Sequence, residues 1–284
     1  MKTIRLLSFS LLAVLLWQAC GSLEKEIDLE LPEYQSQYVV ECYLEPGQPF
    51  TLLLTRSFPY FKPFPSELYD FVESTLINTA TVRIHYAGKT FELENGLYIN
   101  PQTKKLYNYA APELVPADYE NPFELDIITP EGRHITATTR ILPVVPIDSI
   151  VVEFSESADS LARVLTYLTD PPGTDDYYRR MLHKGSLDSI PEQDFTTFDD
   201  FVDDGKLVFG TGFDFVEGDT VISTIFHIDR AYFDFWESVQ NAINANGNPF
   251  SQPSAIISNL QGDANAIGIF TGLSYDRKIV RIRK

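Results

Sequence analysis

Acidic side chains gather in one short stretch of the chain, and carboxylate oxygens are ligands that calcium prefers. The stretch begins at Asp194 and ends just before Gly205. If Gly205 is the glycine of an EF-hand loop, Val202 takes the place of the third ligand and Thr211 that of the closing glutamate, so the pattern fails. A looser calcium site and an ordinary exposed acidic loop both remain open. We predict no metal, with a weak calcium candidate at Asp199, Asp200, Asp203 and Asp204.

Other residues with catalytic potential do not fall into a catalytic pattern. The four histidines are far apart and match no zinc motif, and each fits a surface or satisfied core histidine: His85, His134, His183 and His227. The chain has neither a Gly-Xaa-Ser-Xaa-Gly elbow nor a glycine-rich phosphate loop. Residues 175–180 mix acids, tyrosines and arginines, which fits a polar ligand site or cross-strand ion pairs. We therefore predict no catalytic residue and no cofactor.

Cys20 is the one residue whose surroundings indicate covalent chemistry. Basic residues at Lys2 and Arg5 precede an apolar run from Leu6 to Trp17, which is too short to span a bilayer as a mature helix. A small residue and then Cys20 end the run, an order that resembles the lipobox of bacterial lipoproteins. The resemblance implies a signal peptide over 1–19 and a lipidated Cys20. The alternative is a plain secreted protein.

The segment after Cys20 is polar and acidic, and we read residues 20–34 as a lipidated tether. Residues 21–28 resemble the acidic export signal of surface-exposed lipoproteins in Bacteroidota, although an ordinary solvated tether has the same composition. Several acyl chains on one cysteine anchor a protein stably, whereas a single chain binds only marginally. The second cysteine, Cys42, lies in a strand pattern and is expected to be a small buried hydrophobe.

An aromatic segment follows the first two expected strands. Between residues 58 and 65 three prolines alternate with aromatic residues, a composition that excludes a helix or a central strand. The aromatics either pack back onto the domain or contact a ligand or partner, because clustered aromatics anchor interfaces. The candidate contact residues are Phe58, Tyr60, Phe61 and Phe64.

Charge and composition limit the possible partners. The chain has 284 residues, 40 acidic against 22 basic, and a net charge of −18. Such a surface repels phosphate backbones, so we expect no nucleic-acid partner. A hydrophobic content of 44% is enough to build a core.

Short apolar or alternating segments predict an all-β protein. Residues 38–44 and 50–57 form a hairpin signal, 79–86 alternate as a half-buried strand does, and 94–96 read as a turn. We predict an N-terminal antiparallel β-sandwich of immunoglobulin/transthyretin type over 35–145. A proline-rich connector ends it.

A second antiparallel β domain is expected over 146–284. Strands resume at Ile147, and residues 217–219 read as a hairpin turn. Apolar residues at helical spacing predict one amphipathic helix over about 229–246, with Asp229 as its N-cap. The aromatic face of this helix is expected to cover the second sheet. A last pair of strands follows at 268–273 and 278–282.

The order of motifs along nearly the whole mature chain resembles a family of Bacteroidota lipoproteins known as domain of unknown function 4249. The motifs that carry the resemblance are Cys20–Asp28, Val39–Glu41, Thr81–Ile84, Ile141–Ile150, Asp176–Arg179, Glu217–Asp219, Ile228–Asp229 and Asn248–Leu260. The resemblance implies an all-β lipoprotein of the outer membrane that is commonly encoded beside a TonB-dependent receptor, which makes such a receptor the expected partner. It supplies no catalytic residues.

Three functions are therefore open. The first is a non-catalytic accessory protein, anchored in the outer membrane through Cys20 and exposed at the cell surface or on the periplasmic face, which helps a TonB-dependent transporter capture or gate a ligand. The second is a cell-surface adhesion or structural module. The third is a glycan or peptide hydrolase that uses a pair of carboxylates. The first is our expectation.

Overall fold

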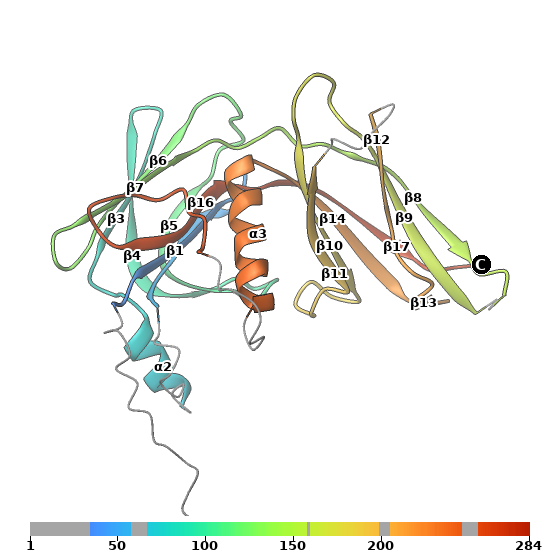
Figure 1. Ribbon diagram of the computed structural model, residues 1–284, viewed down its shortest axis with the longest axis horizontal. Helices are drawn as coiled ribbons and strands as arrows, with labels where there is room; N and C mark the ends of the chain where they lie inside the picture. Colours follow the sequence, from blue (N-terminus) through green and yellow to red (C-terminus); the bar gives the residue numbers. More distant parts are fainter. Residues whose placement is uncertain (1–34, 58–66, 158–159, 199–204, 246–254) are drawn as a thin grey trace, which may run out of the picture. The chain divides into compact units, whose positions relative to one another are not determined.

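The chain forms mainly β-structure, as expected, and the computed structural model describes residues 35–57, 67–157, 160–198, 205–245 and 255–284 (Figure 1). Its elements are β1 Tyr38–Leu44, β2 Pro49–Arg56, α2 Leu68–Thr75, β3 Thr81–Tyr86, β4 Lys89–Ile99, β5 Leu106–Leu114, β6 Phe123–Ile128, β7 His134–Thr139, β8 Ile147–Phe154, β9 Leu161–Thr169, β10 Tyr177–Lys184, β11 Gln193–Phe198, β12 Lys206–Gly210, β13 Phe215–Val216, β14 Thr220–Ile228, α3 Arg230–Ala245, β15 Gln261–Gly262, β16 Ala266–Gly272 and β17 Ser274–Arg281.

Nine strands form one nearly closed sheet in the order β15-β7-β6-β3-β4-β5-β2-β1-β16. The two ends of this order, β15 and β16, are neighbours in the chain, so one segment borders both edges of the sheet. All pairs are antiparallel except β1 with β16, which run parallel with Tyr38 opposite Ala266. The sheet is therefore mixed, whereas the sequence analysis expected an antiparallel one.

The core of the nine-stranded sheet follows from strict alternation. In β1 every second residue is buried, from Tyr38 to Leu44, because successive side chains of a strand point to opposite faces. Cys42 is among them and is fully buried, as expected, and burial raises the pKa of its thiol. Partners such as Phe50, Phe123 and Phe270 complete a single contiguous apolar cluster.

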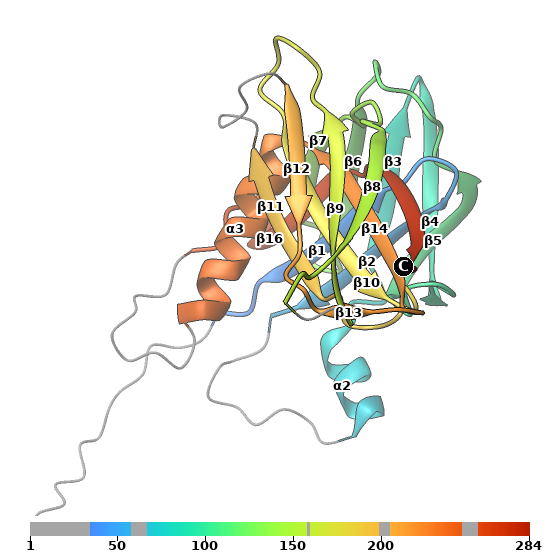
Figure 2. The same ribbon diagram turned by 90° about the vertical axis from the view of Figure 1, so that its right-hand side faces the viewer.

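Two further sheets pack face to face. One contains β11-β10-β14-β17, and the other contains β12-β9-β13 with β8 on the far side of β9; Figure 2 views the molecule from the side of β8, β9 and β12. Two small apolar clusters fill the space between the sheets, around Tyr178 and around Leu182. Arg180, on β10 between these residues, points to the same face and is fully buried.

The predicted helix is confirmed as α3, Arg230–Ala245. A carboxylate oxygen of Asp229 accepts a hydrogen bond from the Tyr232 backbone N–H at 2.7 Å, which is the expected N-cap. The helix lies between β16 of the nine-stranded sheet and strands β10 and β11 (Figure 1). Tyr232 and Phe235 are buried there, so the aromatic face covers parts of two sheets rather than one.

Four local predictions need correction. Residues 94–96 do not turn back: β4 continues to Ile99, and a β-bulge shifts its register against β5 between Asn95 and Tyr98. Strand β5 itself was not predicted. The turn at 217–219 joins strands of different sheets and is not a hairpin. The last two strands do not pair with each other either, because β16 joins β1 and β17 joins β14.

None of the helices in the described part of the chain is both long enough and apolar enough to cross a bilayer.

Candidate functional site

The residues singled out from the sequence fall outside the part of the chain that the structure describes. They are Cys20, the aromatic candidates Phe58, Tyr60, Phe61 and Phe64, and the acidic candidates Asp199, Asp200, Asp203 and Asp204. Within the described ranges, no group of three or more His, Cys, Asp or Glu side chains is arranged to hold a metal ion. The site described below comes from the structure alone.

Two adjoining cavities form a cleft at the turn between β1 and β2. The first, of about 220 Å³, is named the tyrosine pocket and is lined by Tyr43, Glu45, Gln48, Pro49, Thr51, Tyr98, Ile99, Asn100, Pro101, Tyr107 and Ala110. The second, of about 280 Å³, is named the arginine pocket and includes Lys105, Met181, His183, Thr224, Tyr275 and Arg277. Glu45, Gln48 and Asn100 line both.

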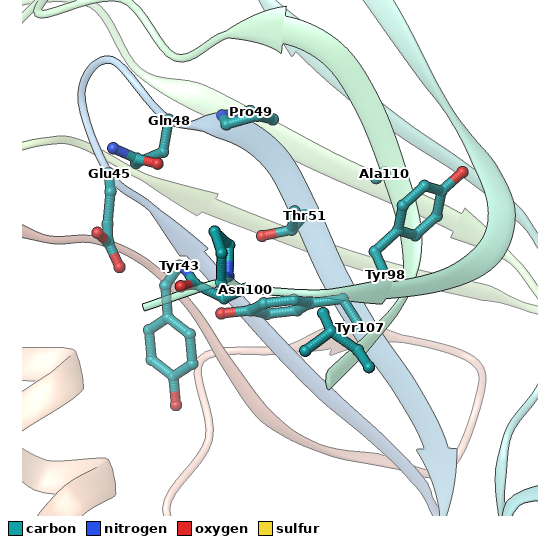
Figure 3. A pocket seen from close by; sticks show the side chains of 11 residues that line it. Tyr43, Glu45, Gln48, Pro49, Thr51, Tyr98, Asn100, Tyr107 and Ala110 are labelled. Carbon is teal, nitrogen blue, oxygen red and sulfur yellow. The ribbon is translucent and has the colours of Figure 1, made fainter. Parts of the chain in front are cut away.

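The tyrosine pocket lies on the outer face of the nine-stranded sheet. The turn after β1 supplies Glu45 and Gln48, while β4 and β5 supply Tyr98 and Tyr107, which are directly paired in the sheet. Figure 3 shows Glu45 and Gln48 on one side of the pocket, Tyr98 on the other and Tyr107 between them. Burial raises the pKa of Tyr107, and the negative charge of Glu45 adds to the effect, so the phenol stays neutral.

Lys105 lies at the edge of the tyrosine pocket and is already neutralised. Its ammonium group is 2.6 Å from a carboxylate oxygen of Glu41. The same ammonium lies 4.3 Å from the ring centroid of Tyr43 and 5.8 Å from that of Tyr107. These rings therefore attract a cation through their faces.

The arginine pocket lies on one face of the sheet formed by β10, β14 and β17. Met181, Thr224 and Arg277 stand opposite one another in the register of these strands, and His183 and Tyr275 are two residues away on the same face. Arg277 donates from Nε to Thr224 Oγ1 at 2.8 Å, and its guanidinium carbon lies 4.6 Å from the ring centroid of Tyr275. This arrangement fixes the guanidinium group at the wall of the cleft.

Three polar groups of the cleft have hydrogen-bonding or ion-pairing capacity that the described residues do not use. No carboxylate lies within ion-pair distance of Arg277, and the Glu45 carboxylate accepts no hydrogen bond there. His183 is 4% exposed, and its Nδ1 has no hydrogen-bond partner. A buried polar group without a partner costs about 1–3 kcal/mol. Such groups at one cleft are the usual mark of a place where a ligand or water completes the hydrogen bonds.

Burial and charge set the protonation of the cleft. Burial raises the pKa of the Glu45 carboxyl, and the positive charges of Arg277 and Lys105 oppose that rise. Burial also lowers the pKa of His183, with a further contribution from Arg277, so the imidazole is neutral at pH 7. At that pH Arg277 is the cation of the arginine pocket that no carboxylate of the described chain neutralises.

The mixed stretch at 175–180 is used mainly to hold the fold together. Arg179 donates from Nε and Nη2 to the two carboxylate oxygens of Asp194, each at 2.7 Å, and its guanidinium lies 3.8 Å from a ring centroid of Trp236 on α3. The Asp176 carboxyl group and His227 Nε2 are hydrogen-bonded at 2.9 Å. The cross-strand ion-pair interpretation of this stretch therefore describes Arg179, and no ligand is needed to explain it.

The histidines differ from one another as the structure places them. His134 is exposed, His85 is half-buried with Nδ1 2.9 Å from Thr90 Oγ1, and His227 is satisfied by Pro143 and Asp176, as the sequence analysis expected of surface or core histidines. His183 is buried without satisfaction at Nδ1, which the sequence did not indicate. Its period-two spacing from Met181 in a predicted strand was the available signal.

The fold and the cleft define a mainly β protein with a ligand-sized recess where a nine-stranded sheet meets a four-stranded one. Residues 24–279 match the family described as Domain of unknown function (DUF4249), and the chain belongs to that family.

Two other comparisons add little. A search of curated protein sequences found no match. Among solved structures, a chain of a structure titled "Cytokine receptor complex - Crystal form 1A" is similar at 9% identity, over 68% of this chain and 86% of that chain, with a TM-score of 0.25. A likeness of that size carries no argument about fold or function.

Proposed function

We propose that the protein is a lipid-anchored accessory protein of the outer membrane that captures a small polar ligand for a TonB-dependent transporter and catalyses no reaction. The anchor is Cys20, and the body faces the cell surface or the periplasm. The observation that supports ligand capture is the cleft, in which the Glu45 carboxylate accepts no hydrogen bond, Arg277 has no carboxylate partner and His183 Nδ1 has no hydrogen-bond partner in the described chain. Membership of the family and the order of the leader and the acidic tether support the anchor and the transporter.

Binding without catalysis is supported by the chemistry of the groups that line the cleft. Arg277 is a fixed hydrogen-bond donor, which holds a ligand but does not exchange protons at neutral pH. Glu45 and His183 are the titratable groups nearest to a general acid and base; both line the arginine pocket, but no hydrogen bond or ion pair joins them. Efficient proton transfer needs such groups within hydrogen-bond reach of the same reacting atom.

The test is a pull-down of the native protein from membranes in mild detergent, with mass spectrometry of the proteins and small molecules recovered. Recovery of a TonB-dependent receptor in stoichiometric amount is the expected result. The matched control is the Cys20→Ala variant, which lacks the acylation site and is expected to leave the membrane fraction. Recovery of lipidated protein always alone contradicts the transporter part of the proposal and favours the adhesion or structural module.

We also retain the narrower fold assignment as a proposal: an immunoglobulin/transthyretin-like sandwich over 35–145 and a separate β domain over 146–284. The alternation of buried residues in β1, β3, β6 and β7 and the lack of a strand between Thr139 and Ile147 support the boundary. The membership of β16 in the nine-stranded sheet argues for strong coupling across it. Limited proteolysis near residue 145 tests the boundary, since two separable domains give two stable fragments.

A further inference from the structure

The charges of the cleft are separated rather than paired. Lys105 and Glu41 neutralise each other at 2.6 Å. Asp276 lines neither pocket, and its two oxygens accept hydrogen bonds from backbone N–H groups at 2.8 Å. Asp188 lines the arginine pocket but is exposed and accepts a hydrogen bond from the Ser186 hydroxyl. What remains is one half-buried carboxylate, Glu45, and one guanidinium, Arg277, which interact electrostatically but are not in contact.

The arginine side of the cleft is suited to a carboxylate. The Arg277 guanidinium uses Nε for Thr224, which leaves its two terminal nitrogens to donate in a fork. A planar fork of this kind matches the two oxygens of a carboxylate. Neutral His183, buried beside it, provides a further donor at Nδ1 in the tautomer that carries the proton there.

The glutamate side is suited to an ammonium group. Glu45 is half-buried at the junction of the two pockets, and its carboxylate has no donor from the described chain. An ammonium group in this part of the cleft would supply the charge-assisted hydrogen bond that the Glu45 carboxylate lacks. A hydroxyl group gains less from a charged carboxylate than an ammonium group does.

Size agrees with a ligand that spans both lobes. Each cavity alone, about 220 Å³ and about 280 Å³, is smaller than the roughly 300–1,000 Å³ of a drug-sized ligand site, and the two together reach that range. Glu45, Gln48 and Asn100 line both cavities, so the two cavities adjoin at these three residues.

We infer that the cleft binds a zwitterion, a free amino acid or a short peptide, with its carboxylate on Arg277 and His183 and its amino group on Glu45. This inference rests on the proposed ligand capture and adds the chemical class of the ligand. Asp188, exposed at the rim on the loop between β10 and β11, already accepts a hydrogen bond from the Ser186 hydroxyl and adds negative charge on the outside. That rim charge disfavours ligands with a net negative charge.

The test is calorimetric titration of the full-length lipidated protein in detergent with alanine and with trialanine. The inference expects one of them to bind, and the better of the two reports the span between Glu45 and Arg277. N-acetylation or C-terminal amidation of that ligand is expected to weaken binding about 10- to 100-fold, since each removes a charge-assisted hydrogen bond. Glucuronic acid, which has a carboxylate and hydroxyls but no amine, is expected to bind as weakly as the N-acetylated ligand.

Variants of the protein test the carboxylate-binding side and the ammonium-binding side of the cleft separately. Arg277→Gln should remove the discrimination against the amidated ligand, and Glu45→Gln should remove the discrimination against the acetylated one. The matched controls are Arg83→Gln and Glu92→Gln, which disrupt an exposed ion pair between β3 and β4 outside the lining of the cleft. Loss of binding in both control variants, or equal binding of blocked and free ligands, overturns the inference.

The same preparations distinguish this inference from the function on which it rests. A transporter that co-purifies with protein that binds neither alanine nor trialanine overturns the zwitterion assignment and leaves the transporter proposal standing. Arg277-dependent binding of glucuronic acid alone also overturns the zwitterion, but it leaves capture of a carboxylate ligand in place. Binding of trialanine without any transporter supports the inference and contradicts the transporter.

Discussion

The nine-stranded sheet and the pair of four-stranded sheets differ in how they bury apolar and charged side chains. The first encloses a single apolar cluster with no charged residue among its buried side chains, whereas the second divides its apolar residues into small clusters. Every buried Asp, Arg or His side chain in the described ranges lies in the second region or its connections: Asp170, Asp176, Arg180, His183 and His227. The first region therefore holds most of the stability, while the second holds polar groups at a cost.

The strongest test of this comparison is the parallel junction of β1 with β16. Gly268 has φ +132°, and a Cβ there would lie 1.9 Å from the Val40 carbonyl oxygen. We expect Gly268→Ala to prevent stable folding, because the backbone of β1 or β16 would have to move where the two strands pair. Gly132→Ala is the control: its φ is +78° with no atom near the added Cβ, so it should cost about 1 kcal/mol. Circular dichroism and thermal unfolding measure both, and a folded Gly268→Ala protein would contradict the expectation.

The next test removes a ring from the single core. Phe123 is fully buried and stacks on Tyr86 with centroids 4.3 Å apart. Phe123→Ala should lower the free energy of unfolding by about 3–5 kcal/mol. Phe209, in edge strand β12 and in a small cluster, serves as the matched ring in the other region, and its replacement by Ala should cost less. Equal losses in urea unfolding would remove the distinction between the two cores.

Two adjacent arginines, Arg179 and Arg180, test the cost of a buried charge in the second region. Arg180 is fully buried between two sheets, where burial lowers its pKa to about 10, and its Nε and Nη2 have no partner in the described chain. Arg180→Met should raise the free energy of unfolding by about 1–2 kcal/mol, because it removes a buried unpaired charge and keeps apolar volume. Arg179→Met should do the opposite, since it leaves Asp194 without its bidentate partner. Thermal unfolding measures the change in stability of both variants. A loss of stability in Arg180→Met would contradict the prediction.

The smallest expected effect is on pH dependence. Burial and Arg277 lower the pKa of His183 below its unfolded value, with Arg179 adding to the shift and Asp194 opposing it. As the pH falls, the unfolded chain binds a proton at this histidine before the folded chain does. The residue therefore reduces stability as pH falls through about 6.5. His183→Gln should flatten the decline in unfolding free energy between pH 7.5 and pH 5.5.

The control for that measurement is His85→Gln, which removes a half-buried histidine from β3. An unchanged slope in His183→Gln would show that this histidine does not carry the acid sensitivity of the region.

The local sequence pattern was enough to predict those strands and helices whose signals lie within one segment of the chain. Apolar and β-branched content beside a Pro/Gly turn predicted β1, alternation predicted β3, and an N-cap followed by apolar residues at helical spacing predicted α3. Strand β5 escaped because Asn108 and Pro112 interrupt its pattern. The structure explains the asparagine. Its buried side-chain amide accepts a hydrogen bond from the Leu54 backbone N–H and donates one to the Leu54 carbonyl oxygen. Such a role depends on a distant strand, so it leaves no mark in the neighbouring sequence.

The cleft could not be predicted for the same reason. Glu45 and Gln48 come from an unremarkable turn, Tyr107 from the missed strand, and Arg277 from the last strand of the chain. Their proximity follows from the pairing of β4 with β5 and of β14 with β17, and from the passage of the chain from β16 to β17. No spacing rule within one segment encodes these pairings, whereas the spacing around Cys20 is local and readable.

The passage from β16 to β17 also bears on the order in which the molecule can be made. The strand that begins the folded body, β1, is completed on one side by a strand that starts at residue 266 of 284. Contacts between residues so far apart in sequence slow folding, because the intervening chain must be gathered first. A growing chain therefore cannot close its first sheet until almost all of it has been synthesised, and the cleft, which needs Arg277, appears only in the finished polypeptide.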